Sequence, residues 1–173
     1  MGNRALTLLC QLADMSNYIR PKTAGASVFF TVSLAVPGDD LLLAEIGHLR
    51  EAVRLTRAER PFTINAWVVL PDHLHAIWTL PADDDDYATR WRLIKARFSM
   101  ALPMGQRRAS HIARQERGIW ARRFWEHHLR SAADFEAHYR GCYMDPVRHG
   151  LVDDPEDWTV SSFHHDRAYR MAS

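Results

Sequence analysis

The stretch of sequence that decides the fold is FTINAWVVLPDHLHAIWTL, residues 62–80. Its two halves, residues 62–70 and 73–80, are rich in β-branched and aromatic residues, which is the composition of β-strands. Only Pro71 and Asp72 separate the two halves. A connection this short joins neighbouring antiparallel strands, so the stretch predicts a β-hairpin.

The segments on either side of this hairpin alternate between strand and helix patterns. Residues 27–35 have the same strand composition and end before a Pro-Gly pair. Residues 41–60 carry apolar side chains at helical spacing and stop before Pro61, which predicts an amphipathic helix. Residues 87–102 repeat this pattern, and Asp86 is placed to cap that second helix.

The chain continues with a fourth strand and a last helix. Residues 124–130 can form the strand, and Ser131 is typical of the N-cap of a helix that starts at Ala132. We expect this helix to end at Pro146, because the residue before a proline avoids helical geometry. The resulting order, β-α-β-β-α-β-α, predicts an α+β sandwich: a four-stranded antiparallel sheet with the helices on one face.

Length and composition set the class of protein. The 173 residues predict one domain with its own core, and the 47% hydrophobic content argues against a disordered chain. No apolar run approaches the roughly 20 residues that span a bilayer, so a membrane protein is not expected. Cys10 and Cys142 fit neither a disulfide framework nor a zinc cluster, which favours the cytoplasm. Residues 1–14 are interpreted either as an N-terminal extension or as the result of a start codon placed upstream of a native start at Met15, and residues 15–173 as the single domain.

The net charge of +1 averages two unlike parts of the chain. Residues 90–148 hold 13 of the 22 basic residues and five of the 21 acidic ones, a formal charge of +8 against −7 for the rest. Such a segment can neutralise nucleic-acid phosphates, although a solvated face without a partner is the commoner reason for it. Its aromatic residues, such as Trp120, either stack on bases or belong to the core. The candidate DNA contacts are Arg90, Arg92, Lys95, Arg97, Arg122, Arg123 and Arg148.

His73 and His75, which flank a single leucine, are the start of a candidate metal site. On a strand the two imidazoles project from the same face, and neutral imidazole binds ions such as Mn²⁺, Fe²⁺ and Zn²⁺. A third ligand must come from elsewhere in the fold, with a carboxylate as the best candidate; without one, such a pair is ordinarily not a metal site. We expect His127 and His128 to face opposite ways and His149 to be solvated.

The candidates for a nucleophile are hydroxyl groups. The sequence has no glycine-rich phosphate loop and no Gly-x-Ser-x-Gly elbow, and neither cysteine has a persuasive base beside it. Tyr139 and Tyr143 stand out, because they lie in the last predicted helix and inside the basic segment.

Four separated stretches of the chain form a longer pattern. They are FTINAWVVLPDHLHAIWTLP, DDDDYATRWRLIKARF, IWARRFWEHHLRSAADFEAHY and MDPVRHGLV. In order and spacing these stretches resemble the REP-associated tyrosine transposases, a family of small HUH-type single-strand transposases. The resemblance extends from Met15 to Arg167, and the agreement of several separated motifs makes it specific.

The resemblance implies a four- to five-stranded antiparallel sheet in a ferredoxin-like, HUH-type sandwich, with the histidine pair on a central strand. Family members cut single-stranded DNA beside hairpins that repetitive extragenic palindromes form. A tyrosine of a late helix attacks the phosphate, which leaves a 5′-phosphotyrosine link and a free 3′-OH, and the histidine pair holds Mg²⁺ or Mn²⁺. The implied partner is single-stranded DNA with palindromic hairpins, bound by a monomer or a homodimer.

The family's functional positions can be carried over one by one. His73 and His75 match the metal-binding pair. Asp145 falls where the family has asparagine, which makes it the candidate third ligand, because a carboxylate suits a hard cation. The nucleophile position, one helical turn earlier, is Gly141.

Gly141 leaves the chemistry open. Tyr139 and Tyr143 are each two residues away, about 200° around the helix, so neither replaces the missing phenol without local distortion. One alternative is that a neighbouring tyrosine has taken over, with Tyr143 favoured because it is nearer to Asp145. The others are an inert hairpin-binding protein, a decaying gene and, last, a metal-dependent hydrolase. The leading prediction is a transposase that cleaves and rejoins DNA through a tyrosine.

Overall fold

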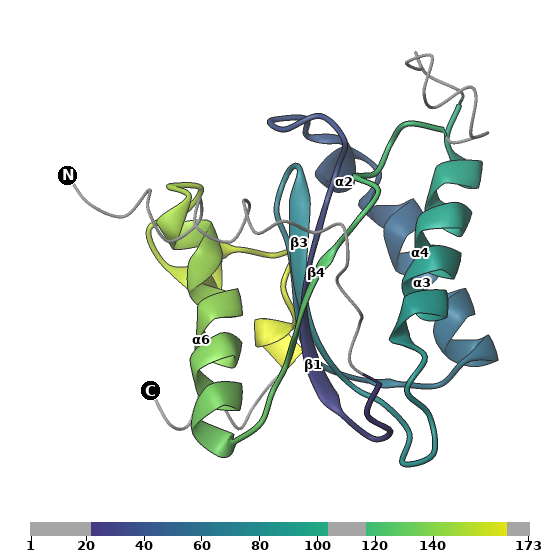
Figure 1. Cartoon of the computed structure of the whole chain (residues 1–173). Helices are drawn as coiled ribbons and strands as arrows, with labels where there is room; N and C mark the ends of the chain where they lie inside the picture. Colours follow the sequence, from purple (N-terminus) through teal and green to yellow (C-terminus); the bar gives the residue numbers. More distant parts are fainter. Residues whose placement is uncertain (1–21, 104–116, 166–173) are drawn as a thin grey trace.

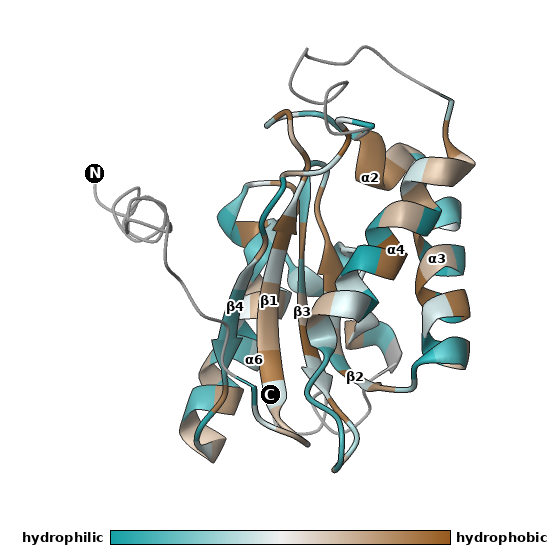
Figure 2. Cartoon of the chain, turned by 45° about the vertical axis from the view of Figure 1, so that its right-hand side comes forward, coloured by the Kyte–Doolittle hydropathy of each residue, from teal (hydrophilic) through white to brown (hydrophobic). Residues whose placement is uncertain are grey.

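Four strands form one antiparallel sheet in the order β2-β3-β1-β4 (Figures 1 and 2). This computed structural model describes residues 22–103 and 117–165, so the predicted extension, residues 1–14, lies outside the described residues. The predicted hairpin is confirmed, because β2 and β3 are antiparallel neighbours. The strands are β1 (Ser27–Ser33), β2 (Thr63–Val69), β3 (His73–Thr79) and β4 (Trp125–His128).

The helices follow the predicted order. Asp86 and Ser131 cap α4 and α6 as expected, by accepting hydrogen bonds from the backbone N–H groups of Thr89 and Asp134. The single helix expected over residues 41–60 is instead two helices that meet at Glu45. No helix among the described residues is both long and apolar enough to cross a bilayer. The helices are α2 (Leu41–Ala44), α3 (Ile46–Glu59), α4 (Tyr87–Ala101) and α6 (Ala132–Arg148), with two 3₁₀ turns, η1 (Pro155–Asp157) and η2 (Ser162–His165).

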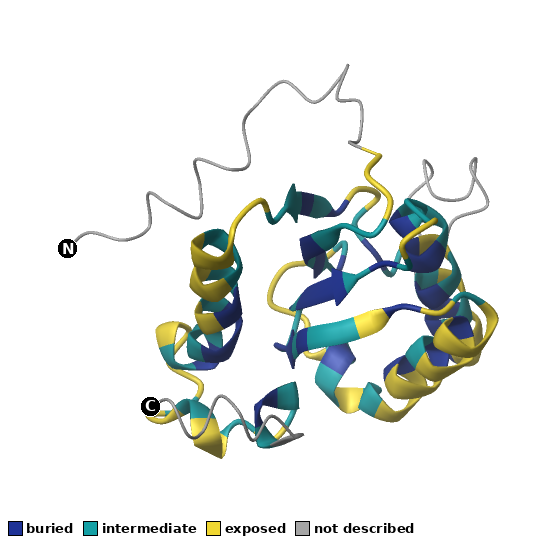
Figure 3. Cartoon of the chain, turned by 90° about the horizontal axis from the view of Figure 1, so that it is seen from below, coloured by how far each residue is buried: buried dark blue, intermediate teal, exposed yellow. Residues whose placement is uncertain are grey.

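Helices cover both faces of the sheet, which corrects the prediction that they cover one face (Figures 1 and 3). The helices α3 and α4 enclose one core, which contains Val28, Phe30 and Trp78 from the strands. Helix α6 encloses a second core, which contains Phe29 and Ile77. The cause is that the central strands β1 and β3 carry buried apolar side chains on both faces, and each set must be shielded from water. Figure 2 shows these two central strands largely in brown.

Helix α6 continues to Arg148 and passes through Pro146, where the sequence predicted its end. The proline lies near the C-terminal end of the helix, and its side chain is buried. The N–H of His149 still donates to the carbonyl of Asp145 at 3.0 Å. The conformational bias of the residue before a proline is therefore outweighed by the packing of the helix. The additional residues keep His149 in helical register with Asp145.

The segment after α6 covers the edge of β2. Val68 forms an isolated bridge with Ser161, and the N–H of Val69 donates to the carbonyl of Val160 at 3.0 Å. The indole Nε1 of Trp158 donates to the carbonyl of Val69 at 2.9 Å. Contacts of this kind protect an edge strand from pairing with another chain.

Arg90 is a structural residue, which removes it from the predicted DNA contacts. Its side chain is 1% exposed, and its Nη2 lies 2.8 Å from Oδ2 of Asp84. The same nitrogen donates to the carbonyl of Pro61 at 2.8 Å, and Nε donates to the carbonyl of Arg60 at 3.3 Å. The hydrogen bond from Arg90 holds the pKa of the Asp84 carboxyl below its usual value. The guanidinium thus joins the end of α3 to the loop before α4.

Replacing Arg90 by alanine is expected to lower the free energy of unfolding by about 3 kcal/mol or more, because it breaks a buried ion pair and leaves a cavity. The matched control is Arg92→Ala, at an exposed position of the same helix, which should change this free energy by less than about 0.5 kcal/mol. Urea denaturation followed by circular dichroism measures both variants. Equal losses in the two variants would contradict the structural role of Arg90.

Candidate metal centre

One strand and one helix bring three potential metal ligands together. His73 and His75 come from β3, and Asp145 comes from α6. The Oδ2 atom of Asp145 lies 3.0 Å from Nε2 of His75 and 3.5 Å from Nε2 of His73. One donor atom from each residue lies within 4.8 Å of the other two. The fold therefore places the predicted histidine pair and the predicted carboxylate in one site.

The second nitrogen of each imidazole has a partner of its own. Nδ1 of His73 lies 2.7 Å from Oδ1 of Asp72, and Nδ1 of His75 lies 2.9 Å from Oγ1 of Thr31. Outer contacts of this kind fix the ring orientation of metal-binding histidines. They leave Nε2 of both rings facing the carboxylate of Asp145. Two imidazoles and one carboxylate suit a divalent cation, so the residues present fit the expected metal ion.

The protonation of the site also favours a cation. Burial opposes ionisation of Asp145, but hydrogen bonds from His73 and His75 outweigh it and hold the pKa of the carboxyl well below its usual value. Burial lowers the pKa of His75. Burial acts on His73 in the same direction, but contacts with Asp145 and Asp72 raise its pKa above the usual value. The ionised Asp145 beside an uncharged His75 is a combination that binds metal ions.

His149 is exposed, as the sequence predicted, and it also reaches the site. Its Nε2 lies 3.5 Å from Oδ2 of Asp145, and its ring centroid lies 5.2 Å from that of His73. The side chain is 47% exposed, so it borders the site on the side of the solvent. The signal in the sequence was the i, i+4 spacing from Asp145 on one helix. The expected helix end at Pro146 concealed that signal.

Comparison with known proteins identifies the family. The chain is 43% identical over 154 residues to the REP-associated tyrosine transposase of Escherichia coli (strain K12), an alignment that covers 89% of this chain and 86% of the relative. This chain belongs to the family of REP-associated tyrosine transposases. A putative REP-associated tyrosine transposase of Haemophilus influenzae is 40% identical over 154 residues, with 88% of each protein covered. No protein-family model matches the chain.

A solved structure supports the same assignment. It is the structure of a REP-associated tyrosine transposase bound to a REP hairpin, and it matches this chain with a TM-score of 0.77 at 43% sequence identity. The match covers 89% of this chain and 86% of that one. The predicted family and the predicted α+β fold with an antiparallel sheet are therefore confirmed.

In this member of the family, the position expected for the nucleophilic tyrosine faces the metal centre but holds a glycine. Gly141 lies one helical turn before Asp145 and so on the same side of α6. A Cβ atom at this position would have Nη1 of Arg148 as its neighbour at 3.8 Å, an ordinary contact. The same Nη1 lies 3.5 Å from the carbonyl oxygen of Gly141. Among the described residues, and apart from the chain neighbours of Gly141 and the backbone of its own helix, this guanidinium is the only group within 4 Å of such a Cβ atom.

Tyr139 and Tyr143 lie in the core between α6 and the sheet. They are 7% and 2% exposed. Their hydroxyl oxygens are 3.4 Å apart, and that of Tyr143 lies 3.1 Å from Oγ of Ser162. In the folded protein both phenols contribute to packing. The catalytic role predicted for them would require a phenol to leave this core.

The sheet separates the predicted DNA contacts. Helix α4, which carries Arg92, Lys95 and Arg97, lies across the sheet from α6, which carries Arg148 (Figure 1). Arg92 and Arg148 are exposed. Lys95 donates to a main-chain carbonyl at 2.6 Å, and Arg97 donates to a threonine hydroxyl of α3 at 2.6 Å. Lys95 and Arg97 therefore also support the fold, and the predicted contacts on α4 and α6 do not share one face.

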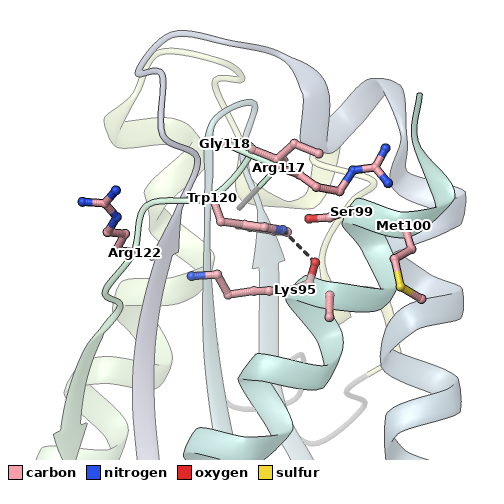
Figure 4. Close-up of a pocket in the computed structure, with 9 residues that line it drawn as sticks. Lys95, Ser99, Met100, Arg117, Gly118, Trp120 and Arg122 are labelled. Carbon is pink, nitrogen blue, oxygen red and sulfur yellow. Dashed lines mark hydrogen bonds between the residues drawn. The ribbon is translucent and has the colours of Figure 1, made fainter. Parts of the chain in front are cut away.

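A basic pocket lies between α4 and the segment that leads to β4 (Figure 4). It has a volume of about 400 Å³, and Lys95, Arg117, Trp120 and Arg122 contribute to its lining. Trp120, which was predicted either to stack on bases or to belong to the core, is 8% exposed and packs in the core. Arg122 and its neighbour Arg123 are exposed. Their exposure is consistent with the predicted contacts to a nucleic acid.

Thr31→Val is expected to weaken Mn²⁺ binding by about 10- to 100-fold, because it removes the partner of Nδ1 of His75. Ser33→Ala changes the next residue on the same face of β1, opposite His73, and is the matched control that should leave the affinity unchanged. Isothermal titration calorimetry measures the dissociation constant of both variants. A Thr31→Val protein that binds Mn²⁺ as tightly as the wild type would contradict this role of Thr31.

Proposed function

We propose that this protein binds single-stranded DNA with REP-type palindromic hairpins, holds a phosphate of the strand at the His73–His75–Asp145 centre, and has lost cleavage by a tyrosine of its own. The single observation that carries the proposal is Gly141, which stands one turn before Asp145 where the family has its nucleophile. The protein keeps the metal ligands and lacks the phenol beside them.

Mg²⁺ or Mn²⁺ is the ion that we assign to this centre. His73 and His75 supply two nitrogens, and Asp145 supplies the oxygen ligand that hard cations prefer. An ion of this class polarises a phosphate oxygen and offsets the negative charge of the strand. Asp72 and Thr31 keep the two imidazoles in orientation through their Nδ1 atoms.

Arg148 and His149 provide the exposed contacts for the strand beside the centre. A guanidinium forms paired hydrogen bonds with phosphate oxygens, and Arg148 lies next to the opening at Gly141. Arg92, Arg122 and Arg123 are assigned to phosphates further from the centre. The hairpin bound by the 43% identical relative supports a hairpin as the ligand.

Burial argues against a displaced tyrosine nucleophile. The ring of Tyr143 packs on Phe163 with centroids 4.9 Å apart and on Tyr139 at the same distance. Withdrawing a large aromatic side chain from a core costs about 3 kcal/mol or more. A tyrosine at position 141 would face the centre without that cost.

Gly141→Tyr is expected to convert the protein from binding to covalent cleavage. The phenol loses its proton to solvent, its oxygen bonds to phosphorus, the P–O3′ bond breaks, and the 3′ oxygen takes up a proton as a free hydroxyl. The fold should tolerate the change, because glycine is about 1 kcal/mol less favourable than alanine within a helix. The measurement is a covalent protein–DNA adduct on a labelled hairpin oligonucleotide with a single-stranded flank, in the presence of Mn²⁺.

The matched control is Gly141→Phe, which adds the ring without the hydroxyl. The wild type and Gly141→Phe should bind the hairpin without an adduct. An adduct in the wild type would overturn the loss of cleavage, and its disappearance in Tyr143→Phe or Tyr139→Phe would identify the nucleophile. Cleavage by the wild type without an adduct would favour a metal-dependent hydrolase. Gly141→Tyr that binds the hairpin but forms no adduct would contradict the position assigned to the phosphate.

Arg148→Ala is expected to weaken hairpin binding and to reduce the slope of log K against log salt concentration by about 1, the amount for one lost phosphate contact. The matched control is Arg140→Ala, which removes another exposed arginine of α6, one paired with Glu136 at 3.3 Å. Fluorescence anisotropy at several salt concentrations measures both. A slope that Arg148→Ala leaves unchanged would exclude the proposed contact.

A further inference from the structure

A second group of potential metal ligands lies apart from the His73–His75–Asp145 centre. It consists of His127 from β4 and of Asp134 and His138 from the first turns of α6. One donor atom from each of these three residues lies within 4.8 Å of the other two. The proposed function makes no use of this group. The prediction that His127 and His128 face opposite ways is confirmed, because His127 contacts α6 while the ring of His128 lies against Tyr87 of α4.

The donor atoms of the group converge from two elements of the fold. Nε2 of His127 lies 3.1 and 3.0 Å from the two carboxylate oxygens of Asp134. Nδ1 of His138 lies 3.1 Å from Oδ1 of the same carboxylate. In a four-coordinate Zn²⁺ site, with bonds of about 2.0–2.1 Å, the donor atoms are about 3.3 Å apart. The distances of 3.0–3.1 Å between each imidazole nitrogen and the carboxylate are close to this value.

Aromatic neighbours hold the two imidazoles in place. The rings of His127 and His138 stack with centroids 4.7 Å apart, and Trp125 stacks on His127 at 5.9 Å. Phe29 lies 4.9 Å from the ring of His138. The side chains of the three ligands are 25% to 36% exposed, so an ion can enter from solvent. A metal site with an open position requires imidazole rings of fixed orientation and access from solvent, and this group has both.

The carboxylate at the centre of the group is ionised at neutral pH. The main-chain N–H of Arg130 and the imidazole of His127 hold the pKa of Asp134 below its usual value. Nδ1 of His138 also lies 2.9 Å from the main-chain carbonyl of Asp134. Hydrogen bonds alone therefore offer a competing explanation of the group. Metal binding separates the two explanations, because a hydrogen-bonded cluster without a site would not retain an ion.

We propose that His127, Asp134 and His138 bind a transition-metal ion, with Zn²⁺ as the best match, and that the ion clamps α6 onto the edge strand β4. Two imidazoles and one carboxylate form a ligand set typical of open Zn²⁺ sites, whereas Mg²⁺ prefers oxygen ligands. Strand β4 has four residues and stands at one edge of the sheet. A metal cross-link there would hold the N-terminal half of the helix that carries Gly141 and Asp145.

The test measures Zn²⁺ binding by the full-length His73→Ala/His75→Ala variant, prepared without an affinity tag. These two substitutions remove the first centre. We expect isothermal titration calorimetry to find one Zn²⁺ per chain. Adding His138→Ala should weaken this binding by at least about 100-fold, because a direct ligand is lost. The matched control is His48→Ala, because Nδ1 of His48 also lies 2.8 Å from a carboxylate, in an exposed pair with Glu45 outside both ligand groups.

His127→Ala removes a ligand from the other element and gives a second, independent loss. Circular dichroism checks that each variant folds. Zn²⁺ should raise the Tm of the His73→Ala/His75→Ala protein, and it should leave the Tm unchanged in the triple variant that also carries His127→Ala. Co²⁺ in place of Zn²⁺ should show the visible absorption of a four-coordinate site. A folded His73→Ala/His75→Ala protein that binds no Zn²⁺, or Zn²⁺ binding that survives both ligand losses, would overturn the proposal. These outcomes do not depend on the proposed function, because the first centre is absent.

Discussion

The two central strands carry buried apolar side chains on both faces of the sheet, and the rest of the structure depends on this constraint. Burial of one face requires α3 and α4, and burial of the other requires α6. The second face also carries His73 and His75, so the helix that completes the core brings Asp145 to the imidazoles. Core packing and the candidate metal centre are therefore products of the same contact between β3 and α6.

Electrostatics then determines what this contact can do. A buried carboxylate is costly unless it is hydrogen-bonded, and the imidazoles around Asp145 meet that requirement while leaving it ionised. Burial raises the pKa of the neighbouring Cys142 thiol, which keeps that sulfur protonated and unreactive. With glycine at position 141, the side of α6 toward the centre offers a carboxylate, an exposed guanidinium and an imidazole. In the proposed function, the guanidinium and the imidazole contact the phosphate, and the carboxylate acts through the cation that it would hold.

Sequence patterns succeeded where they depend on neighbours along the chain. The β-hairpin, the caps at Asp86 and Ser131 and the common direction of the histidine pair follow from local spacing and turn length. They failed where contacts between distant segments decide. Packing of α6 carries the helix past Pro146, and the end of α3 together with the loop before α4 captures Arg90 in the interior. The missed role of His149 is a consequence of the misplaced helix end.

The sequence by itself determined the types of the elements, their order, the placement of two imidazoles on one strand face and, through four separated motifs, the family. Only the tertiary structure decided which side chains meet. It assigned Tyr139 and Tyr143 to the core, Asp145 to the histidine pair, and His127 to Asp134 and His138. The physical reason is that α6 buries one of its faces against the sheet. The choice of this face fixes the rotation of the helix about its axis and therefore the direction of every side chain on it. That face is chosen by the apolar surface of a sheet whose strands are distant in the chain: His75 of β3, for example, lies 70 residues before Asp145.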